Sequence, residues 1–176
     1  MTDDTDPVVT VSERALAVII EETQAADDGC ETGGILLGAV SNRDADVRHA
    51  GRPGSAAIRT PTSFLRDLDA AQAFAEATWA VDRSQWIGEW HTHPGMSSIP
   101  STTDVRTYAD FLDDPTLGFA EFISVIVTPT ATGPVLAAWW CGDGIIRPAT
   151  IRVGSRISSN RGAAVLSPTH SQQHDD

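Results

Sequence analysis

Lysine is absent from this chain of 176 residues, cysteine occurs only twice, and there is no long apolar run. Without a stretch of roughly 20 apolar residues, a helix that spans a membrane is excluded. Cys30 and Cys141 are too few for a disulfide framework and form no CxxC motif, so we expect two reduced, buried thiols. The acidic residues 1–7 lack the basic region of a signal peptide, which predicts a cytoplasmic protein.

All 12 basic side chains are Arg, against 17 Asp and 7 Glu, and the formal net charge is −12. Such a surface repels phosphate backbones and anionic lipids, which disfavours nucleic acid and membranes as partners. Two explanations of the missing Lys stay open. Either the protein is adapted to concentrated salt, or its gene comes from a GC-rich genome that favours Arg codons.

The hydrophobic pattern predicts a single domain over residues 8–154, preceded by a disordered lead-in (1–7) and followed by a disordered tail (155–176). Strands are predicted over 8–11, 31–40, 45–50, 86–90, 122–128, 135–140 and 145–153, and helices over 13–25, 64–82 and 101–112. Of the loops between these predicted elements, the Gly- and Pro-rich loop 51–61 is the widest segment in which a mobile flap would fit. This order predicts an α+β class domain, a mixed β-sheet flanked by helices.

Side chains suited to binding a metal gather in a window of 14 residues, His91-Thr-His93-Pro94 to Ser101-Thr-Thr-Asp104. The two histidines point the same way from an extended segment, and Pro94-Gly95 supplies a bend that lets them converge. Asp104, on the first turn of the next helix, then closes the site. Three N/O ligands with a fourth position for water are typical of catalytic Zn²⁺.

Each part of this window also has a purely structural explanation. A lone HxH pair is more often two strand residues with ordinary hydrogen bonds, and Ser101-x-x-Asp104 is a helix capping box. Capping and ligation are compatible, because a carboxylate has several lone pairs. The conjunction of all the elements in one window favours the metal site.

A hydrolase also needs a group that accepts a proton from the attacking water. Two carboxylates are candidates. Glu89 lies on the same strand face as the two histidines, and Glu31 lies at the mouth of a Gly-rich buried strand, where an ionised group is costly without a function. The residues by themselves do not choose between them.

The spacing from His91-Thr-His93-Pro94 to Ser101 and Asp104 resembles the JAMM signature of the JAB/MPN metalloproteases, and Glu31-Thr-Gly-Gly-Ile-Leu-Leu-Gly38 resembles the upstream segment that carries the glutamate of that family. The resemblance covers residues 8–151 and is nearest to the small prokaryotic members. It implies a fold related to the cytidine-deaminase-like architecture. It further implies that His91, His93 and Asp104 bind Zn²⁺, that Glu31 is the general acid/base, and that Ser101 stabilises the oxyanion. A deaminase is disfavoured, since its P-C-x-x-C motif is absent.

With this resemblance, Glu89 becomes a group that hydrogen-bonds a ligand imidazole or contacts the substrate. The implied activity is a zinc metalloprotease that cleaves after the C-terminal Gly of a ubiquitin-like modifier or a sulfur-carrier protein with a Gly-Gly end. Two alternatives stay open: a hydrolase that frees an amino acid such as cysteine from a sulfur carrier, and a non-catalytic MPN scaffold. The chain has little room for insertions that grip a partner, so loop 51–61 or a separate protein is expected to hold the partner's body.

Overall fold

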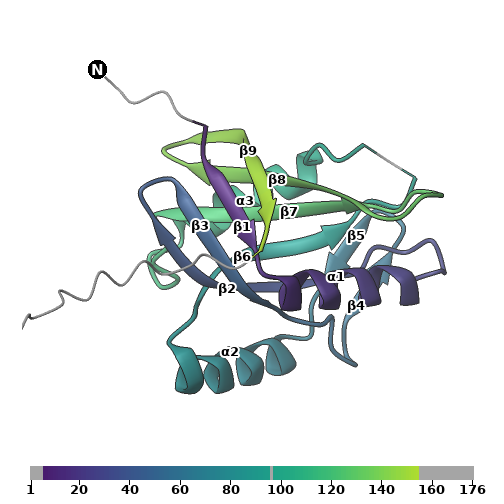
Figure 1. The fold of residues 1–176 in the computed structure, drawn as a ribbon, viewed down its shortest axis with the longest axis horizontal. Helices are drawn as coiled ribbons and strands as arrows, with labels where there is room; N and C mark the ends of the chain where they lie inside the picture. The colour runs from purple at the N-terminus through teal and green to yellow at the C-terminus, as the bar shows by residue number, and fades with distance from the viewer. Residues whose placement is uncertain (1–5, 96, 155–176) are drawn as a thin grey trace, which may run out of the picture.

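The computed structural model of the chain describes residues 6–95 and 97–154 (Figure 1). Seven strands form one mixed sheet, which closes into a barrel in the order β1-β3-β2-β6-β7-β8-β9. Their bounds are β1 Val8–Val11, β2 Gly33–Ser41, β3 Asp44–Ala50, β6 Gln85–Thr92, β7 Glu121–Thr128, β8 Val135–Gly142 and β9 Ile145–Val153. The predicted tail 155–176 and most of the lead-in 1–7 lie outside the described residues.

The sheet is mixed because three of its pairings are parallel. Strand β1 pairs in parallel with both β3 and β9, and β6 pairs in parallel with β7, whereas the other neighbours are antiparallel. The pairing of β1 with β9 closes the barrel, and Figure 1 shows these two strands side by side. The α+β class and the mixed sheet flanked by helices are therefore confirmed, whereas the closure was not predicted.

Three helices lie against the sheet: α1 Glu13–Ala25, α2 Leu68–Asp82 and α3 Thr102–Asp113. Each begins at a side chain that accepts a backbone N–H of the first turn, namely Ser12, Asp67 and Ser101. Such caps satisfy donors that the helix itself leaves without partners. Among the described residues, none of the helices is long and apolar enough to cross a membrane.

The prediction of a helix over 64–82 was wrong at its start. Residues Ser63–Leu65 form strand β5, which pairs with β4 (Ile58–Thr60) in a two-stranded hairpin, and α2 begins only after Asp67. The hydroxyl of Thr60 contacts that of Ser63 at 2.7 Å across the turn, which stabilises the hairpin. Loop 51–61 is thus shorter than predicted, because its last three residues before Pro61 belong to β4.

Two apolar clusters build the core. The larger one joins the barrel to α1 through side chains such as Val11, Ile19 and Trp90, and the smaller one joins α3 to the sheet through Tyr108 and Phe122. Cys141 belongs to the smaller cluster and is fully buried, but Cys30 is only half-buried, and both thiols are free. The prediction of reduced cysteines is confirmed, and that of a buried Cys30 is corrected, because Cys30 lies in the loop before β2.

Candidate metal centre

Strand β6 carries His91 and lies between β2 and β7, and His93 follows directly after its last residue, Thr92. Residue His91 is opposite Gly33 of β2 and Ile126 of β7, and the N–H of His93 donates to the Val127 carbonyl at 2.9 Å. Both imidazoles are almost completely buried. Gly33 permits the close approach of β2, because a Cβ at that position would lie 2.3 Å from the carbonyl oxygen of Trp90. The sheet therefore holds the backbone of both histidines on two sides.

Helix α3 supplies the third group from its first turn. The Ser101 hydroxyl accepts the N–H of Asp104 at 3.1 Å, and the Asp104 carboxylate accepts the N–H of Ser101 at 2.6 Å. The predicted capping box is thus present. It fixes the Asp104 carboxylate and leaves lone pairs directed at the two histidines.

The sequence-predicted ligand atoms converge. Nε2 of His91 lies 3.0 Å from Nε2 of His93, and the Asp104 carboxylate oxygens lie 3.4 Å from the first and 3.2 Å from the second. Zinc bonds of 2.0–2.1 Å in tetrahedral array place neighbouring ligand atoms about 3.3 Å apart. The 3.4 Å distance is to Oδ1 of Asp104 and the 3.2 Å distance to Oδ2, and one ligand atom from each residue lies within 4.8 Å of the others, so the three residues can surround one Zn²⁺ ion.

The second nitrogen of each imidazole has a different environment. Nδ1 of His93 lies 3.0 Å from the Ser97 carbonyl, and the indole N–H of Trp139 donates to the carbonyl of Ser98 at 2.9 Å. A carbonyl acceptor keeps the proton on Nδ1 and the lone pair on Nε2, which is the form that binds metal. Nδ1 of His91 is buried without a hydrogen-bond partner, and the nearest carboxylate oxygen, from Glu89, is 3.8 Å away.

The side chains of this metal centre shift one another's pKa values. Burial acts to raise the pKa of Asp104, but hydrogen bonds with His91 and His93 outweigh it and hold that pKa well below its usual range. For His93, burial acts to lower the pKa, whereas the contacts with Asp104 and the Ser97 carbonyl raise it more. Asp104 is therefore a carboxylate at neutral pH, as a metal ligand must be.

Glu31 lies just before β2 and shares a cavity with the metal-ligand set. The Thr32 carbonyl accepts the N–H of Thr92 at 2.8 Å, so the pairing of β2 with β6 continues past Gly33 and brings Glu31 level with His93. Glu31 is 5% exposed, and within the described part of the chain its carboxylate has no hydrogen bond or ion pair. Burial raises its pKa, although the two histidines partly oppose this.

Glu89, the other candidate base, is engaged elsewhere. Its carboxylate forms an ion pair with the guanidinium of Arg66, and only 11% of each side chain is exposed. The Arg66 guanidinium also lies 5.6 Å from the ring centres of Trp86 and Phe111. The expected hydrogen bond from Glu89 to a ligand imidazole is not formed, since 3.8 Å to His91 is too long.

The cavity measures about 500 Å³ and combines residues far apart in the sequence. Its lining includes His91, Asp104, Glu31 and Glu89, together with residues of the β4–β5 hairpin and the start of α2. Neither His93 nor Ser101 is part of the lining; each contacts Asp104 instead. Sequence reasoning missed the hairpin wall and Arg66. A turn at Pro61-Thr62 between two short β-prone runs was the available signal for the hairpin, whereas no local pattern marks Arg66.

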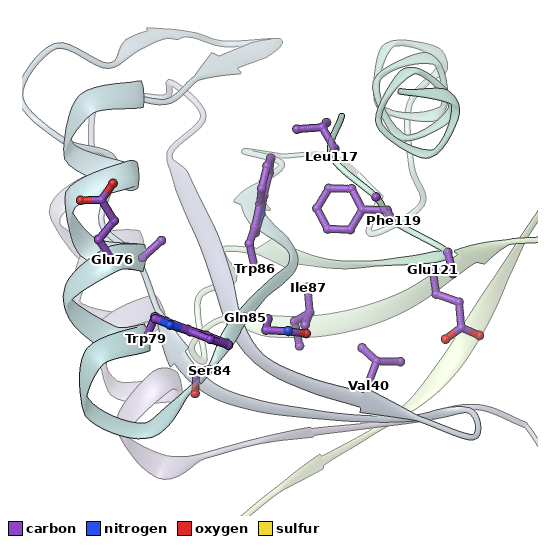
Figure 2. A pocket seen from close by; sticks show the side chains of 13 residues that line it. Val40, Glu76, Trp79, Ser84, Gln85, Trp86, Ile87, Leu117, Phe119 and Glu121 are labelled. Carbon is purple, nitrogen blue, oxygen red and sulfur yellow. The ribbon is translucent and has the colours of Figure 1, made fainter. Parts of the chain in front are cut away.

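A larger cavity of about 690 Å³ lies elsewhere, between α2, the start of β6 and the segment before β7 (Figure 2). Figure 2 shows Trp79 and Glu76 on the helix, with Trp86, Leu117 and Phe119 across from them. Its lining holds two carboxylates, Glu76 and Glu121, but no His or Cys. The chemistry therefore belongs to the smaller cavity.

Comparison with known proteins agrees with this geometry. A family described as prokaryotic homologs of the JAB domain matches residues 12–142. A CD-NTase/cGAS isopeptidase of Pseudomonas aeruginosa is 34% identical over 104 residues, which are 58% of this chain and 66% of that protein. A probable metalloprotease, y4qB, of Sinorhizobium fredii is 36% identical over 89 residues, 48% of this chain and 54% of that protein.

The matched part thus spans less than two thirds of either relative. Among solved structures, protein DSY2949 from Desulfitobacterium hafniense matches with a TM-score of 0.64 and 18% identity. That match covers 86% of this chain and 97% of the other, and at this identity it supports the fold alone.

Proposed function

Because the chain belongs to the prokaryotic JAB-domain family, we propose that it is a zinc-dependent peptidase or isopeptidase acting on ubiquitin-like or sulfur-carrier proteins. The observation that carries the proposal is the convergence of His91, His93 and Asp104, whose ligand atoms lie within 4.8 Å of one another beside a cavity that Glu31 lines.

His91, His93 and Asp104 would hold the ion. When bound, Zn²⁺ lowers the pKa of a water molecule and polarises a carbonyl oxygen. Glu31 accepts a proton from the attacking water and then donates it to the leaving amine. Its exposure of 5% and its lack of an ion pair among the described residues leave the carboxylate available for both transfers. Glu89 is unsuited to this role, because Arg66 occupies its carboxylate.

Ser101 would stabilise the oxyanion that forms on the scissile carbonyl. As the N-cap of α3, its hydroxyl oxygen accepts the N–H of Asp104, and a hydroxyl has in addition one O–H that can donate. Donors aimed at a developing negative charge contribute strongly to catalysis in a site with little water.

The proposed substrate ends in Gly-Gly and enters as an extended chain. Residues of the β4–β5 hairpin and of α3 line the cavity and the two histidines are buried, so glycines, which have no side chains, would allow the scissile bond to approach them. The Pseudomonas aeruginosa relative is named as an isopeptidase, which supports an amide-cleaving reaction on a protein.

Several finer predictions belong to the same proposal. The catalytic domain spans residues 8–154, the fold is related to the cytidine-deaminase-like architecture, and the protein works in the cytoplasm. The leaving group is a lysine side chain, a peptide or an amino acid such as cysteine, and these share one chemistry. A non-catalytic scaffold would not need the ligand atoms to converge beside a buried carboxylate.

The decisive experiment tests both the requirement for zinc and the role of Glu31 as the base. The protein is incubated with Gly-Gly-ended fusions of ubiquitin-like and sulfur-carrier proteins, and cleavage is followed by intact mass. We expect cleavage after the second Gly, its loss with a chelator and its return with Zn²⁺. The Glu31→Gln variant should bind zinc normally and lose at least about 100-fold in rate.

Glu76→Gln is the matched control, because it changes a helix-surface carboxylate away from the metal centre and should keep full activity. Full activity of Glu31→Gln would refute the role of Glu31. An absence of bound zinc in the purified and zinc-treated protein would refute the metal chemistry.

A further inference from the structure

The segment that presents Glu31 is attached to the β4–β5 hairpin through both backbone groups of this residue. The N–H of Glu31 donates to the carbonyl of Thr60 at 2.8 Å, and the carbonyl of Glu31 accepts Nε–H of Arg59 at 2.9 Å. The Glu31 carboxylate itself is left free for the cavity. The hairpin therefore fixes where the backbone of the proposed base lies.

Arg59 makes further contacts with the same segment. Its two terminal nitrogens donate to the two oxygens of the Asp28 carboxylate, each at 3.0 Å, and one of them also donates to the Cys30 carbonyl at 3.3 Å. Asp28 in turn accepts the N–H of Cys30 at 3.0 Å. With the bond to Glu31, one guanidinium thus binds three of the four residues from Asp28 to Glu31.

This pattern differs from an ordinary surface ion pair. Only 26% of the Arg59 side chain is exposed, the contact with Asp28 is bidentate, and two backbone carbonyls are held by the same planar group. A planar guanidinium can satisfy several acceptors in fixed directions, which an ammonium group cannot do. Arg59 is not part of the cavity lining, so it does not touch a substrate there.

We propose that Arg59, together with Asp28, is a positioning residue for the base: it holds the Glu31 segment against the hairpin and so sets the reach of the Glu31 carboxylate into the cavity. The proposal rests on the proposed function of Glu31. It also means that the hairpin wall of the cavity and the base move as one unit, because Thr60 and Arg59 belong to the same strand, β4.

The test uses the zinc-loaded full chain and the conservative variant Arg59→Lys. This variant keeps the positive charge and removes the planar guanidinium that donates to several acceptors at once. Turnover is measured on a peptide ending in Leu-Arg-Gly-Gly joined to aminomethylcoumarin. We expect kcat to fall about 10- to 100-fold, since a small displacement of a catalytic group is costly. KM and zinc affinity should stay within about twofold, because Arg59 touches neither the substrate nor the ligands.

Two comparisons separate positioning from loss of structure. Arg52→Lys is the matched control, since Arg52 contacts the carboxylates of Glu21 and Glu22 away from the base, and it should leave kcat unchanged. In a Glu31→Gln background, Arg59→Lys should change the residual rate by less than about twofold, because residues that act as a unit are not additive.

Hydrogen exchange supplies a readout that needs no substrate. In Arg59→Lys, the amides of residues 28–32 should exchange about ten times faster than in the wild type, and in Arg52→Lys they should not. Unchanged exchange of this segment, or an equal loss of rate with and without Glu31, would overturn the proposal. A wild-type protein that cleaves nothing, with exchange as expected, would instead refute the proposed function and leave the attachment of the segment standing.

Discussion

Beside the metal-ligand set, Arg66 and Glu89 form a pair of opposite charges that is almost withdrawn from solvent. Such a pair contributes modestly to stability when complete, but the loss of one partner leaves an uncompensated buried charge. Trp86 and Phe111 flank the guanidinium and exclude water from it. The pair therefore holds the Glu89 carboxylate on Arg66, 3.8 Å from His91, which is why we propose Glu31 as the base.

Replacing Arg66 with Met should destabilise the protein by about 3 kcal/mol, because Glu89 is then buried without its cation. Met preserves much of the volume between the two aromatic rings. Urea unfolding in the presence of a chelator measures the effect. The double variant Arg66→Met/Glu89→Gln should recover most of the loss, and a single variant within about 0.5 kcal/mol of the wild type would show that the pair is not coupled.

The contact between Asp82 at the end of α2 and His49 on β3 predicts a pH dependence. Hydrogen bonds from Ser84 and His49 lower the pKa of Asp82 to about 2, below its ordinary value of about 3.9. Because the folded-state pKa is the lower one, the stabilisation is complete above about pH 4 and is lost as the pH falls from there towards 2.

Asp82→Asn should accordingly cost about 1 kcal/mol at pH 7, a modest value because a third of this side chain is exposed to solvent. The difference from the wild type should shrink as denaturant unfolding is repeated from pH 5 down to pH 3. The exposed Asp110, changed to Asn, serves as the control. A difference that stays constant with pH would contradict the assignment.

Among the elements, two short segments without ligand residues of their own orient Glu31 and His93. The β4–β5 hairpin holds Glu31, and the loop after β6 holds His93 through the Ser97 carbonyl. That loop is fastened to β8 by the bond from the Trp139 indole to the Ser98 carbonyl. The orientation of a metal ligand thus depends on a tryptophan more than 40 residues away in the sequence.

Trp139→Phe removes the indole N–H that fastens this loop. We expect zinc affinity to fall about tenfold, since contacts that orient a ligand imidazole affect metal binding to this degree. Competition with a chromophoric chelator measures it. Trp79→Phe on the exposed face of α2 is the matched control and should bind zinc as the wild type does. Equal affinities of the two variants would show that the loop is held by other contacts.

The start of α2 and the register of β2 with β6 are features that the local sequence does not specify. Helix α3 begins at the capping side chain predicted for it, Ser101, and α1 begins at the residue predicted, whereas the start of α2 was misplaced by four residues. Phe64 and Leu68 share a helical spacing, but a hairpin turn at residues 60–63 and the cap by Asp67 place Phe64 in a strand. The register shift opposite Leu36 and Leu37 leaves Ile87 without a partner on β2. Pairing decides such features, not propensity.

For the molecule as a whole, the described chain begins and ends on neighbouring strands. The N–H of Thr150 donates to the Pro7 carbonyl and that of Gly154 to the Val11 carbonyl, so β1 and β9 complete the barrel. A closed barrel keeps β6 and β2 in fixed register, and this register sets the position of Glu31 relative to the histidines. Because the candidate ligands converge only in the folded chain, we predict that folding and metal binding are coupled.

Zinc should stabilise the folded state by about 2.7 kcal/mol at a free concentration 100 times its Kd. Thermal unfolding of the chelator-treated protein, with and without Zn²⁺, measures this as a rise in Tm. His91→Ala should abolish the response. A Tm that is independent of zinc in the wild type would argue against a site that is formed only by folding.

The net charge of −12 allows the two explanations of the missing Lys to be tested. If the protein is adapted to salt, molar KCl should raise its Tm by several degrees, because repulsion among the carboxylates is screened. A Tm that does not respond to KCl would favour the explanation from codon usage.

The sequence by itself determined the ligand types, their convergence and the capping box, because His91, His93, Ser101 and Asp104 lie within one short window whose geometry is local. It also determined the family and the mixed sheet with helices. The tertiary structure decided the rest: Glu89 forms an ion pair with Arg66, Glu31 lies level with His93, and the β4–β5 hairpin contributes to the lining of the cavity. These are contacts between segments that are distant in the chain, and they depend on strand pairing and burial, which no local pattern specifies.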